Sequence, residues 1–344
     1  MKITCIGLDL AKNVFQLHGV DVTGMAVLRK KLKRHELLAF LATLDRTNEC
    51  AIGMESCCGA EHWARACRKL GYDVRIMNPA FVKPYVKGNK NDVNDAAGIC
   101  EATSRPNMRF VPIKSLEQQD LMLLHNQRAQ SIKRRTALAN QLRGMLMGYG
   151  IVVEKNLSKL RQALPDILED AQNELSTLAR EIFAQMRDEL IHIDQLIAQS
   201  DKKIQALALA SKDCQRLMGI PGVGPVSATA YLAVIGDGKQ FKNGRQCAAY
   251  LGLTPKQHAS GNHNTLLGIS KRGHPYLRTL LVHGARASFT AAKKRQSDGS
   301  ASRTDQWAMA LAEKRHTNVA VVALASKNAR IAWSVLRHQQ PFMV

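Results

Sequence analysis

The chain has 344 residues, 45% hydrophobic and 22% charged, which is typical of a globular protein and excludes disorder over most of its length. Apolar runs such as Val319 to Ala325 are far shorter than the roughly 18 residues of a membrane span, and the eight cysteines lack the spacing of a zinc site or a disulfide framework. The apolar stretch before Asp9 is too short for a signal-peptide core, so we expect an intracellular protein that binds no membrane. Lys and Arg number 49 against 28 Asp and Glu, and this net charge of +21 predicts a polyanion as the partner.

The first hundred residues alternate between short strands and helices. A meander of three strands is predicted at Ile3–Leu10, Val14–Val20 and Met25–Leu32, and a helix lies within residues 35–44. The elements expected after it are a strand at Cys50–Met54, a helix at Ala60–Leu70, a strand at Asp73–Met77 and a helix at Asp92–Thr103. This order indicates a ribonuclease H-like α/β domain. A doubly wound nucleotide fold would lack the meander and would need a G-x-G-x-x-G turn, which is absent.

Four acidic residues of this domain form a candidate metal site. Asp9 ends the first strand, Glu55 follows a buried strand, and Asp92 and Asp95 share one face at the start of a helix. Four gathered carboxylates repel one another and need cations, and hard oxygen ligands favour Mg²⁺ or Mn²⁺. The plainer alternative is that Asp92 only caps the helix and that Asp95 lies in its first turn, where the helix dipole favours it. It leaves Asp9 and Glu55, which stand in apolar strand contexts, without an explanation.

The middle of the chain predicts long helices. Apolar residues recur at spacings of three and four from Leu116 to Met147 and from about Ile167 to Leu209. The two helices would pair as a hairpin or associate between chains as a coiled coil. Residues 113–210 hold 13 basic and 12 acidic residues, which suits a scaffold or oligomerisation element, and an ordinary helical subdomain fits equally well. We therefore expect three domains, at residues 1–112, 113–210 and 211–344.

The last domain is expected to be mainly helical and to bind nucleic acid. Residues 211–344 hold 19 basic and 5 acidic residues, whereas residues 1–112 hold 17 and 11. The glycine-rich segment from Gly219 to Gly224 precedes an apolar helix and resembles a helix-hairpin-helix turn. In such a turn, backbone N–H groups near Gly222 and Gly224 would hold a phosphate without reading the base sequence. A tight turn between packed helices is the alternative.

A serine segment follows the glycine-rich turn. Ser260 lies beside Gly261 in a predicted polar loop at residues 257–262, and basic side chains that could bind phosphates follow at Lys271, Arg272 and Arg278. Composition alone favours a turn residue over a nucleophile at Ser260, because no His/Asp relay stands at a recognisable spacing.

Ordered segments along the whole chain resemble the transposases of the insertion-sequence-110 type and, within them, the 1111 subgroup. These segments are GLDLAKN, MES, KNDVNDA, RFVPIKS, GIPGVGPVSA, AYLGLTP, ASG, GISKRGHPYLRTLLVHGARA and NVAVVALASKNARIAW. The N-terminal domain of that family is similar to Holliday-junction resolvases and is RuvC-like. Its D-E-D-D acids correspond to Asp9, Glu55, Asp92 and Asp95, and its C-terminal serine corresponds to Ser260.

The resemblance implies a DNA recombinase in which Ser260 attacks a DNA phosphate. Mg²⁺ (or Mn²⁺) held by the four acids would stabilise the charge on that phosphate and on the leaving oxygen. It also implies donor and target DNA, a noncoding guide RNA encoded by the element that pairs with both, and a bacterial cytoplasmic protein associated with the nucleoid. A homodimer or homotetramer would build each composite site from the acids of one protomer and the serine of another.

Two other functions remain open. A structure-specific nuclease resembling a Holliday-junction resolvase would use the acids with water as the nucleophile, and Ser260 would be an ordinary loop residue. A nonenzymatic nucleic-acid-binding protein would use the same acids only for structure.

Overall fold

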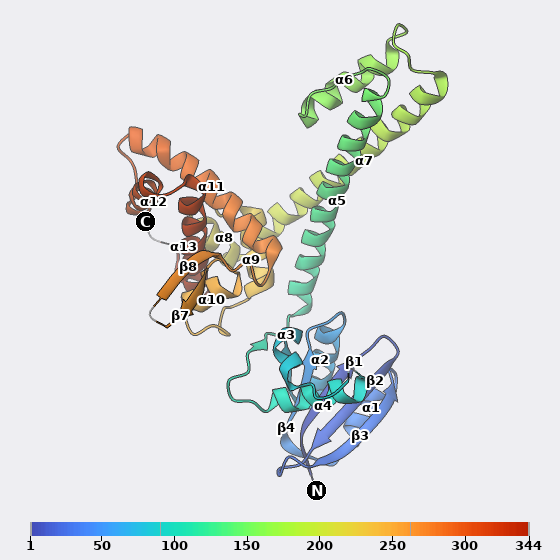
Figure 1. The fold of residues 1–344 in the computed structure, drawn as a ribbon, viewed down its shortest axis with the longest axis vertical. Coiled ribbons are helices and arrows are strands. Elements are labelled where there is room, and N and C mark those ends of the chain that lie inside the picture. The colour runs from blue at the N-terminus through green and yellow to red at the C-terminus, as the bar shows by residue number, and fades with distance from the viewer. Residues whose placement is uncertain (1, 90, 262, 343–344) are drawn as a thin grey trace. The chain divides into compact units, whose positions relative to one another are not determined.

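The computed structural model describes residues 2–89, 91–261 and 263–342, and it divides into two compact units at residues 1–115 and 116–344 (Figure 1). The first unit contains a mixed sheet with helices, and the second is mainly helical. The predicted boundary at residue 210 falls between two helices of the second unit. The division into three domains therefore stays a prediction.

The first unit is built on a mixed sheet of six strands within its described residues, in the order β3-β2-β1-β4-β5-β6. β1 pairs antiparallel with β2 and parallel with β4, while β2 pairs antiparallel with β3, and β5 lies parallel to β4. The strands are β1 (Ile3–Leu10), β2 (Val14–Val20), β3 (Ala26–Lys33), β4 (Arg46–Glu55), β5 (Asp73–Met77) and β6 (Phe110–Val111). The helices are α1 (Leu37–Ala42), α2 (Ala60–Lys69), α3 (Pro79–Val82) and α4 (Asp92–Thr103), with a 3₁₀ turn at Lys83–Tyr85.

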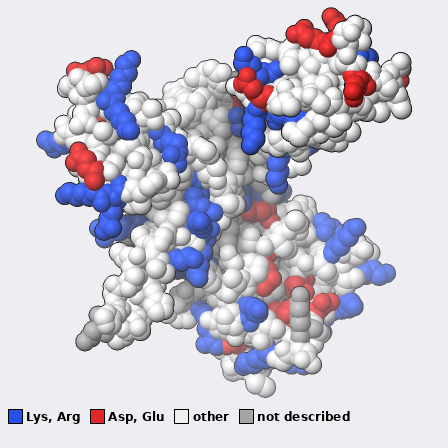
Figure 2. All heavy atoms as spheres, turned by 45° about the horizontal axis from the view of Figure 1, so that its top comes forward, with Lys and Arg blue, Asp and Glu red and all other residues white. Residues whose placement is uncertain are grey.

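Side chains alternate between the two faces of this sheet. Ile6 and Leu8 of β1 and Ile52 of β4 point to one face, where they pack with buried residues of α1 and α2 such as Leu37 and Trp63. Helix α4 covers the other face and contacts β1, β2 and β4. On the side of the molecule seen in Figure 2, the acidic side chains of this unit gather in the middle, with basic side chains around them.

The strand and helix order predicted for this unit is confirmed, and the match is consistent with a ribonuclease H-like fold. The structure adds the short helix α3 and the two-residue strand β6, neither of which has a sequence pattern of its own. Both are shorter than the period over which apolar spacing can be recognised.

The second unit begins with a helical hairpin. Helices α5 (Leu116–Met147) and α7 (Thr177–Ala210) pack against each other through a shared apolar core, and α6 (Leu157–Glu169) covers part of it. Arg128 near the start of α5 pairs with Asp201 at 2.5 Å, and Arg135 further along pairs with Asp194 at 3.3 Å. Later residues of α5 thus meet earlier residues of α7, so the two helices run antiparallel.

One predicted helix boundary in this hairpin is wrong. The sequence predicts a helix from about Ile167, but α6 ends at Glu169 and α7 begins only at Thr177. The reason is local capping: the side chain of Ser176 accepts a hydrogen bond from the backbone N–H of Ala179, which starts a new helix there. Apolar spacing continued across this break and concealed it.

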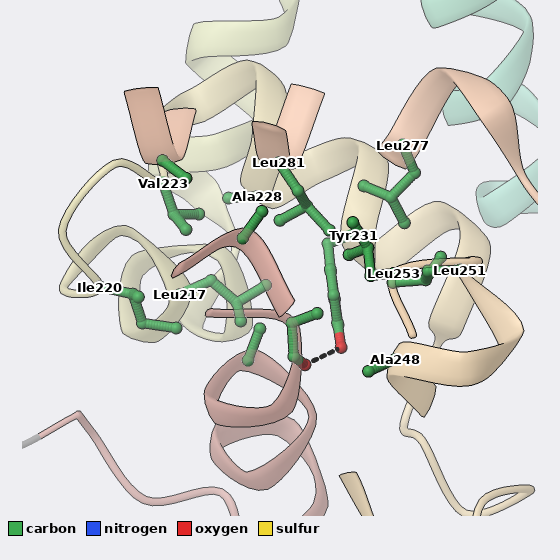
Figure 3. Close-up of a cluster of buried hydrophobic side chains, with 14 of the residues drawn as sticks. Leu217, Ile220, Val223, Ala228, Tyr231, Ala248, Leu251, Leu253, Leu277 and Leu281 are labelled. Atoms are coloured by element: carbon green, nitrogen blue, oxygen red, sulfur yellow. Dashed lines mark hydrogen bonds between the residues drawn. The ribbon is translucent and has the colours of Figure 1, made fainter. Parts of the chain in front are cut away.

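The rest of the unit is a helical body around one buried core. Its elements are α8 (Lys212–Met218), α9 (Pro225–Ile235), α10 (Gly244–Tyr250), β7 (Pro255–Ser260), β8 (His263–Ile269), α11 (Pro275–Ser297), α12 (Arg303–Lys314) and α13 (Thr317–His338). Figure 3 shows Tyr231 of α9 in this core, where its hydroxyl donates to the carbonyl oxygen of Ala329 at 2.7 Å. Among the described helices, α13 is long and apolar enough to cross a membrane, although half of its apolar stretch is buried inside this body.

Candidate active site

The face of the sheet under α4 is organised in rows of opposed residues. Gly7 and Asp9 of β1 lie on this face because side chains alternate along a strand. Gly53 is opposite Gly7 in the parallel strand β4, so the next position on the same face places Glu55 beside Asp9. On the other side of β1, Gln16 of β2 is opposite Asp9. Two of the predicted acids are therefore neighbours across the ends of two paired strands.

Helix α4 lies directly on β1. The thiol of Cys5 donates to the carbonyl oxygen of Cys100, and the thiol of Cys100 donates to that of Cys5, each at 3.7 Å. A Cβ atom at Gly7 would lie only 2.1 Å from the carbonyl oxygen of Ala96. Since the strand passes from Cys5 to Gly7 while these helix partners pass from Cys100 back to Ala96, α4 runs antiparallel to β1.

This direction brings the first turn of α4 to the end of the sheet where Asp9 lies. Asp92 and Asp95 are in that turn. Asp92 lies about one helical turn before Ala96, whose carbonyl oxygen covers Gly7, and Asp95 directly precedes Ala96. The helix starts there because the Asn91 side chain accepts a hydrogen bond from the backbone N–H of Asn94 at 2.8 Å. The backbone thus carries all four predicted acids to one end of one face of the sheet.

The pKa of the Cys57 thiol is affected by the carboxylates at this end of the sheet. Burial is the main cause that raises the pKa of Cys57, and the neighbouring Cys58 and the carboxylates of Asp9 and Glu55 raise it further. Both carboxylates therefore act on the same thiol, which lies two residues after Glu55. The two carboxylates are therefore both near the Cys57 thiol.

The donor set of this site fits a hard divalent cation. All four side chains are carboxylates, the ligand type that Mg²⁺ and Mn²⁺ prefer. In the described part of the chain, no three His, Cys, Asp or Glu side chains come close enough together to hold a metal ion. Convergence of the four acids on a cation stays a prediction.

Ser260 lies in a β-hairpin, so the prediction of a loop at residues 257–262 is wrong. Ser260 is the last residue of β7 and pairs with His263 of β8, and Gly261 takes the positive φ of 54° that the turn needs. All residues of β7 are exposed, and the hairpin forms a two-stranded sheet of its own. Its strands are held by backbone pairing, so they lack the apolar alternation that signals a strand. Asn262 lies outside the described residues.

The glycine-rich turn has a packing role at one of its two predicted positions. Gly222 has φ of +87°, and a Cβ atom there would lie 2.3 Å from the carbonyl oxygen of Gly284 in α11. Close approach of two backbones therefore explains this glycine. Gly224 is the N-cap of α9, and a Cβ atom there would meet nothing within 4 Å. Among the described residues, nothing therefore blocks the Cβ direction of Gly224.

The three predicted phosphate-binding side chains differ in their surroundings. Lys271 and Arg272 are exposed in the segment after β8. Arg278 of α11 donates to the carbonyl oxygens of Leu251 at 3.1 Å and of Arg272 at 2.9 Å. Its guanidinium is thus engaged in holding that segment, and Lys271 and Arg272 are the two that project from it.

Comparison with known proteins gives matches along the whole chain. Residues 214–299 match a family model described as the IS116/IS110/IS902 family of transposases, and residues 6–151 match a transposase model of the IS110 DEDD type. A probable family 20 transposase of Pseudomonas aeruginosa is 43% identical over 340 residues, 98% of each chain. The transposase for insertion sequence element IS1111A of Coxiella burnetii is 42% identical over 340 residues, which cover 99% of this chain and 91% of that protein.

The chain belongs to the IS110 family of transposases. It is an insertion-sequence transposase, and the expectation of an enzyme acting on DNA is confirmed at that level. The segment matched at residues 6–151 contains the four acids, and the segment matched at residues 214–299 contains Ser260 and the glycine-rich turn. The DEDD-type domain also suggests that this transposase depends on a divalent metal.

Two residues that position the acids of this transposase escaped the sequence-based interpretation. Gly7 stands two residues before Asp9, and Gly53 stands two residues before Glu55. Both face α4, and a Cβ atom at Gly53 would lie 1.7 Å from Oγ1 of Thr103. The repeated G-x-acid spacing at two strand ends is the signal that could have identified them.

Proposed function

We propose that this transposase is a DNA recombinase that joins DNA covalently to Ser260, with the four acids as its metal site. The observation that carries the proposal is the neighbouring placement of Asp9 and Glu55 on paired strand ends, with the first turn of α4 at the same end. Ser260, exposed at the end of a projecting hairpin strand, is accessible to a DNA backbone.

The reaction exchanges one phosphate ester for another. A bond forms between Oγ of Ser260 and the phosphorus, and the bond from phosphorus to a deoxyribose oxygen breaks. The serine proton passes to solvent and the departing oxygen takes up a proton. Asp9, Glu55, Asp92 and Asp95 would hold Mg²⁺ or Mn²⁺, which when bound stabilises negative charge on the phosphate and on the leaving oxygen. The reverse exchange with a second DNA end rejoins the strands.

Nucleic acid would be held by groups of the second unit. The first turn of α9, next to Gly224, offers backbone N–H groups to a phosphate, and Lys271 and Arg272 add exposed positive charge. Arg278 would position Arg272 by donating to the backbone carbonyl oxygen of Arg272, in place of the direct phosphate contact predicted for Arg278. The partners are donor and target DNA and a noncoding guide RNA from the element, whose base pairing selects the sites, at the bacterial nucleoid in the cytoplasm.

The assembly would be a homodimer or homotetramer with composite sites. The acids lie in the first unit and Ser260 in the second, so each protomer carries both halves of a site on separate bodies. The antiparallel α5–α7 hairpin, with exposed apolar residues such as Leu178, Ile182 and Ile191 along α7, offers a surface for association between protomers.

A covalent-adduct assay tests the proposal. The full-length protein is incubated with DNA of the element ends, its guide RNA and Mg²⁺, then denatured, and protein-linked DNA is measured. We expect an adduct that disappears in Ser260→Ala and persists in Ser270→Ala, a control further along the same segment. Asp9→Asn should abolish the adduct as well. DNA cleavage that survives Ser260→Ala would contradict the proposal and favour the nuclease, and inactivity of the wild-type protein would favour the nonenzymatic binder.

A further inference from the structure

One edge strand of the first unit carries a row of positive charges on the same face as the acids. The register of β2 and β3 opposes Gln16 to Lys31 and His18 to Arg29. Because Gln16 is opposite Asp9 on β1, directly opposed positions put Lys31 and Asp9 in one row on the face that α4 covers. With strands about 5 Å apart, Lys31 starts roughly 10 Å from the backbone of Asp9.

Arg29, Lys31 and Lys33 form a basic ladder along β3. They occupy alternate positions, so their side chains leave the same face about 7 Å apart. All three are exposed, and within the described residues their charged groups have no ion-pair or hydrogen-bond partner, while the backbone N–H of Lys33 donates to Oε2 of Glu36 at 2.7 Å. Three cations of one sign in a row, unpaired, repel one another and favour a polyanion alongside them.

The intervening residue Lys30 is the opposite case. It points to the other face of β3, where its ammonium lies 4.4 Å from the centroid of the Phe40 ring of α1. Lysines placed only to prevent edge-to-edge pairing of sheets would serve on either face. Here the three unpaired cations share the face of the acids, and the one on the opposite face has an intramolecular partner. The distribution by face therefore points to a ligand and not only to protection of the edge.

A cleft lies next to the ladder on the same face. It encloses about 220 Å³ between β2 and α4 and is lined by His18, Val20, Lys87, Asn94 and Glu101, among others. Within the part of the chain that the structure describes, Nδ1 of His18 is buried without a hydrogen-bond partner. Burial, followed by the charge of Arg29, lowers the pKa of this imidazole. Glu101 is paired with Arg105, and among the described residues Lys87 has no ion-pair partner to offset its charge. A polyanion lying along β3 would thus have the basic ladder on one side of this cleft and Lys87 on the other.

We propose that the Arg29–Lys31–Lys33 ladder is a binding track for the phosphodiester backbone of a nucleic-acid strand, DNA or RNA, which runs along β3 toward the acid row. The strand-end position of Lys33 and the row shared by Lys31 and Asp9 give the track its direction. Binding to the ladder follows from its charge alone, whereas delivery of the strand to the acids rests on the proposed function of those acids.

The test compares neighbouring lysines on opposite faces of one strand. Full-length protein is titrated with fluorescent oligonucleotides of mixed sequence, as duplex DNA, single-stranded DNA and RNA, over a range of salt concentrations. Lys31→Gln should weaken binding and reduce the slope of log K against log salt by about 1, while Lys30→Gln leaves both unchanged. The combined change of Arg29, Lys31 and Lys33 to Gln should weaken binding about tenfold or more and remove about 2 to 3 from the slope. The arm that shows the effect identifies DNA or RNA as the ligand.

A second measurement uses the unaltered protein. Bound oligonucleotide should protect Lys31 and Lys33, but not Lys30, from acetylation by an amine-reactive ester, read by mass spectrometry. Equal binding by Lys31→Gln and Lys30→Gln in all three arms, or no protection of Lys31 and Lys33, would overturn the track. An Asp9→Asn variant that still forms the DNA adduct would instead contradict the proposed function, and it would leave the binding results untouched.

Discussion

Two opposed glycines set how closely α4 approaches the sheet. A Cβ atom at Gly7 would lie 2.1 Å from the backbone of Ala96, and one at Gly53 would lie 1.7 Å from Thr103, both far inside van der Waals contact. The two glycines are neighbours on β1 and β4, so together they form a shallow groove for the helix. The depth of this groove fixes the height of the acidic first turn of α4 above Asp9.

Replacing Gly7 with Ala is expected to push α4 away from β1. The new methyl group meets backbone atoms, which cannot rotate away as a side chain could, so overpacking should cost about 1–3 kcal/mol. Hydrogen–deuterium exchange should then show less protection in β1 and α4. The DNA adduct should fall strongly, because Asp92 and Asp95 move with the helix.

Gly144 of α5 provides the matched control. A Cβ atom there would meet nothing within 4 Å, and alanine favours a helix interior over glycine by about 1 kcal/mol. Gly144→Ala should therefore keep or increase protection and leave the adduct unchanged. Full activity of Gly7→Ala would show that the close approach of α4 does not position the acids.

Secondary structure in the first unit follows from local patterns, which is why it could be predicted. β1, β2 and β5 have the predicted bounds, and so does α4, because an Asn cap and a run of apolar residues at helical spacing mark its limits. The hairpin of β7 and β8 could not be predicted in this way. All of β7 is exposed, so selection for burial leaves no apolar alternation in it.

The site itself was only partly predictable. Strand ends and helix starts give the candidate acids, but their row depends on which strands pair and in what register, which is a long-range property. The basic ladder of β3 illustrates the same limit. Its residues are visible as charges in the sequence, yet the face they share with Asp9 becomes known only when β3 is placed beside β2 and β2 beside β1.

A buried histidine joins three helices of the second unit. His125 of α5 is fully buried, with Nδ1 3.0 Å from the hydroxyl of Tyr276 in α11 and Nε2 3.0 Å from Oγ1 of Thr229 in α9. Since the Thr229 hydroxyl donates to the carbonyl oxygen of Pro225, it accepts from Nε2. Nδ1 then accepts from Tyr276, so the imidazole must be neutral to make both contacts.

This network predicts a loss of stability in acid. Burial, followed by the charge of Arg128, lowers the pKa of His125 to about 4 from its ordinary 6.5. Between these values the unfolded chain binds a proton at His125 that the folded chain does not. The free energy of unfolding therefore falls as pH falls from about 6.5 to about 4, by about 3 kcal/mol in total.

Hydrogen exchange of peptides from α5, α9 and α11 at several pH values checks this expectation. Wild-type protection, corrected for intrinsic exchange rates, should fall below pH 6.5 more steeply than in His125→Gln, which is less stable at neutral pH but lacks the titrating group. Exposed His35 serves as the control, and His35→Gln should follow the wild-type curve. Parallel curves for wild type and His125→Gln would contradict the assignment.

The two proposed sets of reacting groups lie in separate units of the molecule. The four acids lie in the unit of residues 1–115, which carries the sheet, and Ser260 lies in the unit of residues 116–344, which carries most of the excess positive charge. The second unit begins in sequence with the long helices α5 and α7. A chain built in this way can supply acids to one site and a hydroxyl to another, which is the arrangement proposed for the oligomer.

Mixing two inactive variants tests whether each site is shared between protomers. Asp9→Asn keeps Ser260 and Ser260→Ala keeps the acids, so neither variant alone should form the DNA adduct. In a mixed oligomer, the acids of a Ser260→Ala protomer can meet the serine of an Asp9→Asn protomer, and random mixing gives one intact pairing in roughly four. The mixture should therefore recover about a quarter of the wild-type adduct, linked only to the Asp9→Asn chain, which a size tag identifies. If each site is built within one protomer, every site in the mixture contains a defect, and no adduct appears at any mixing ratio.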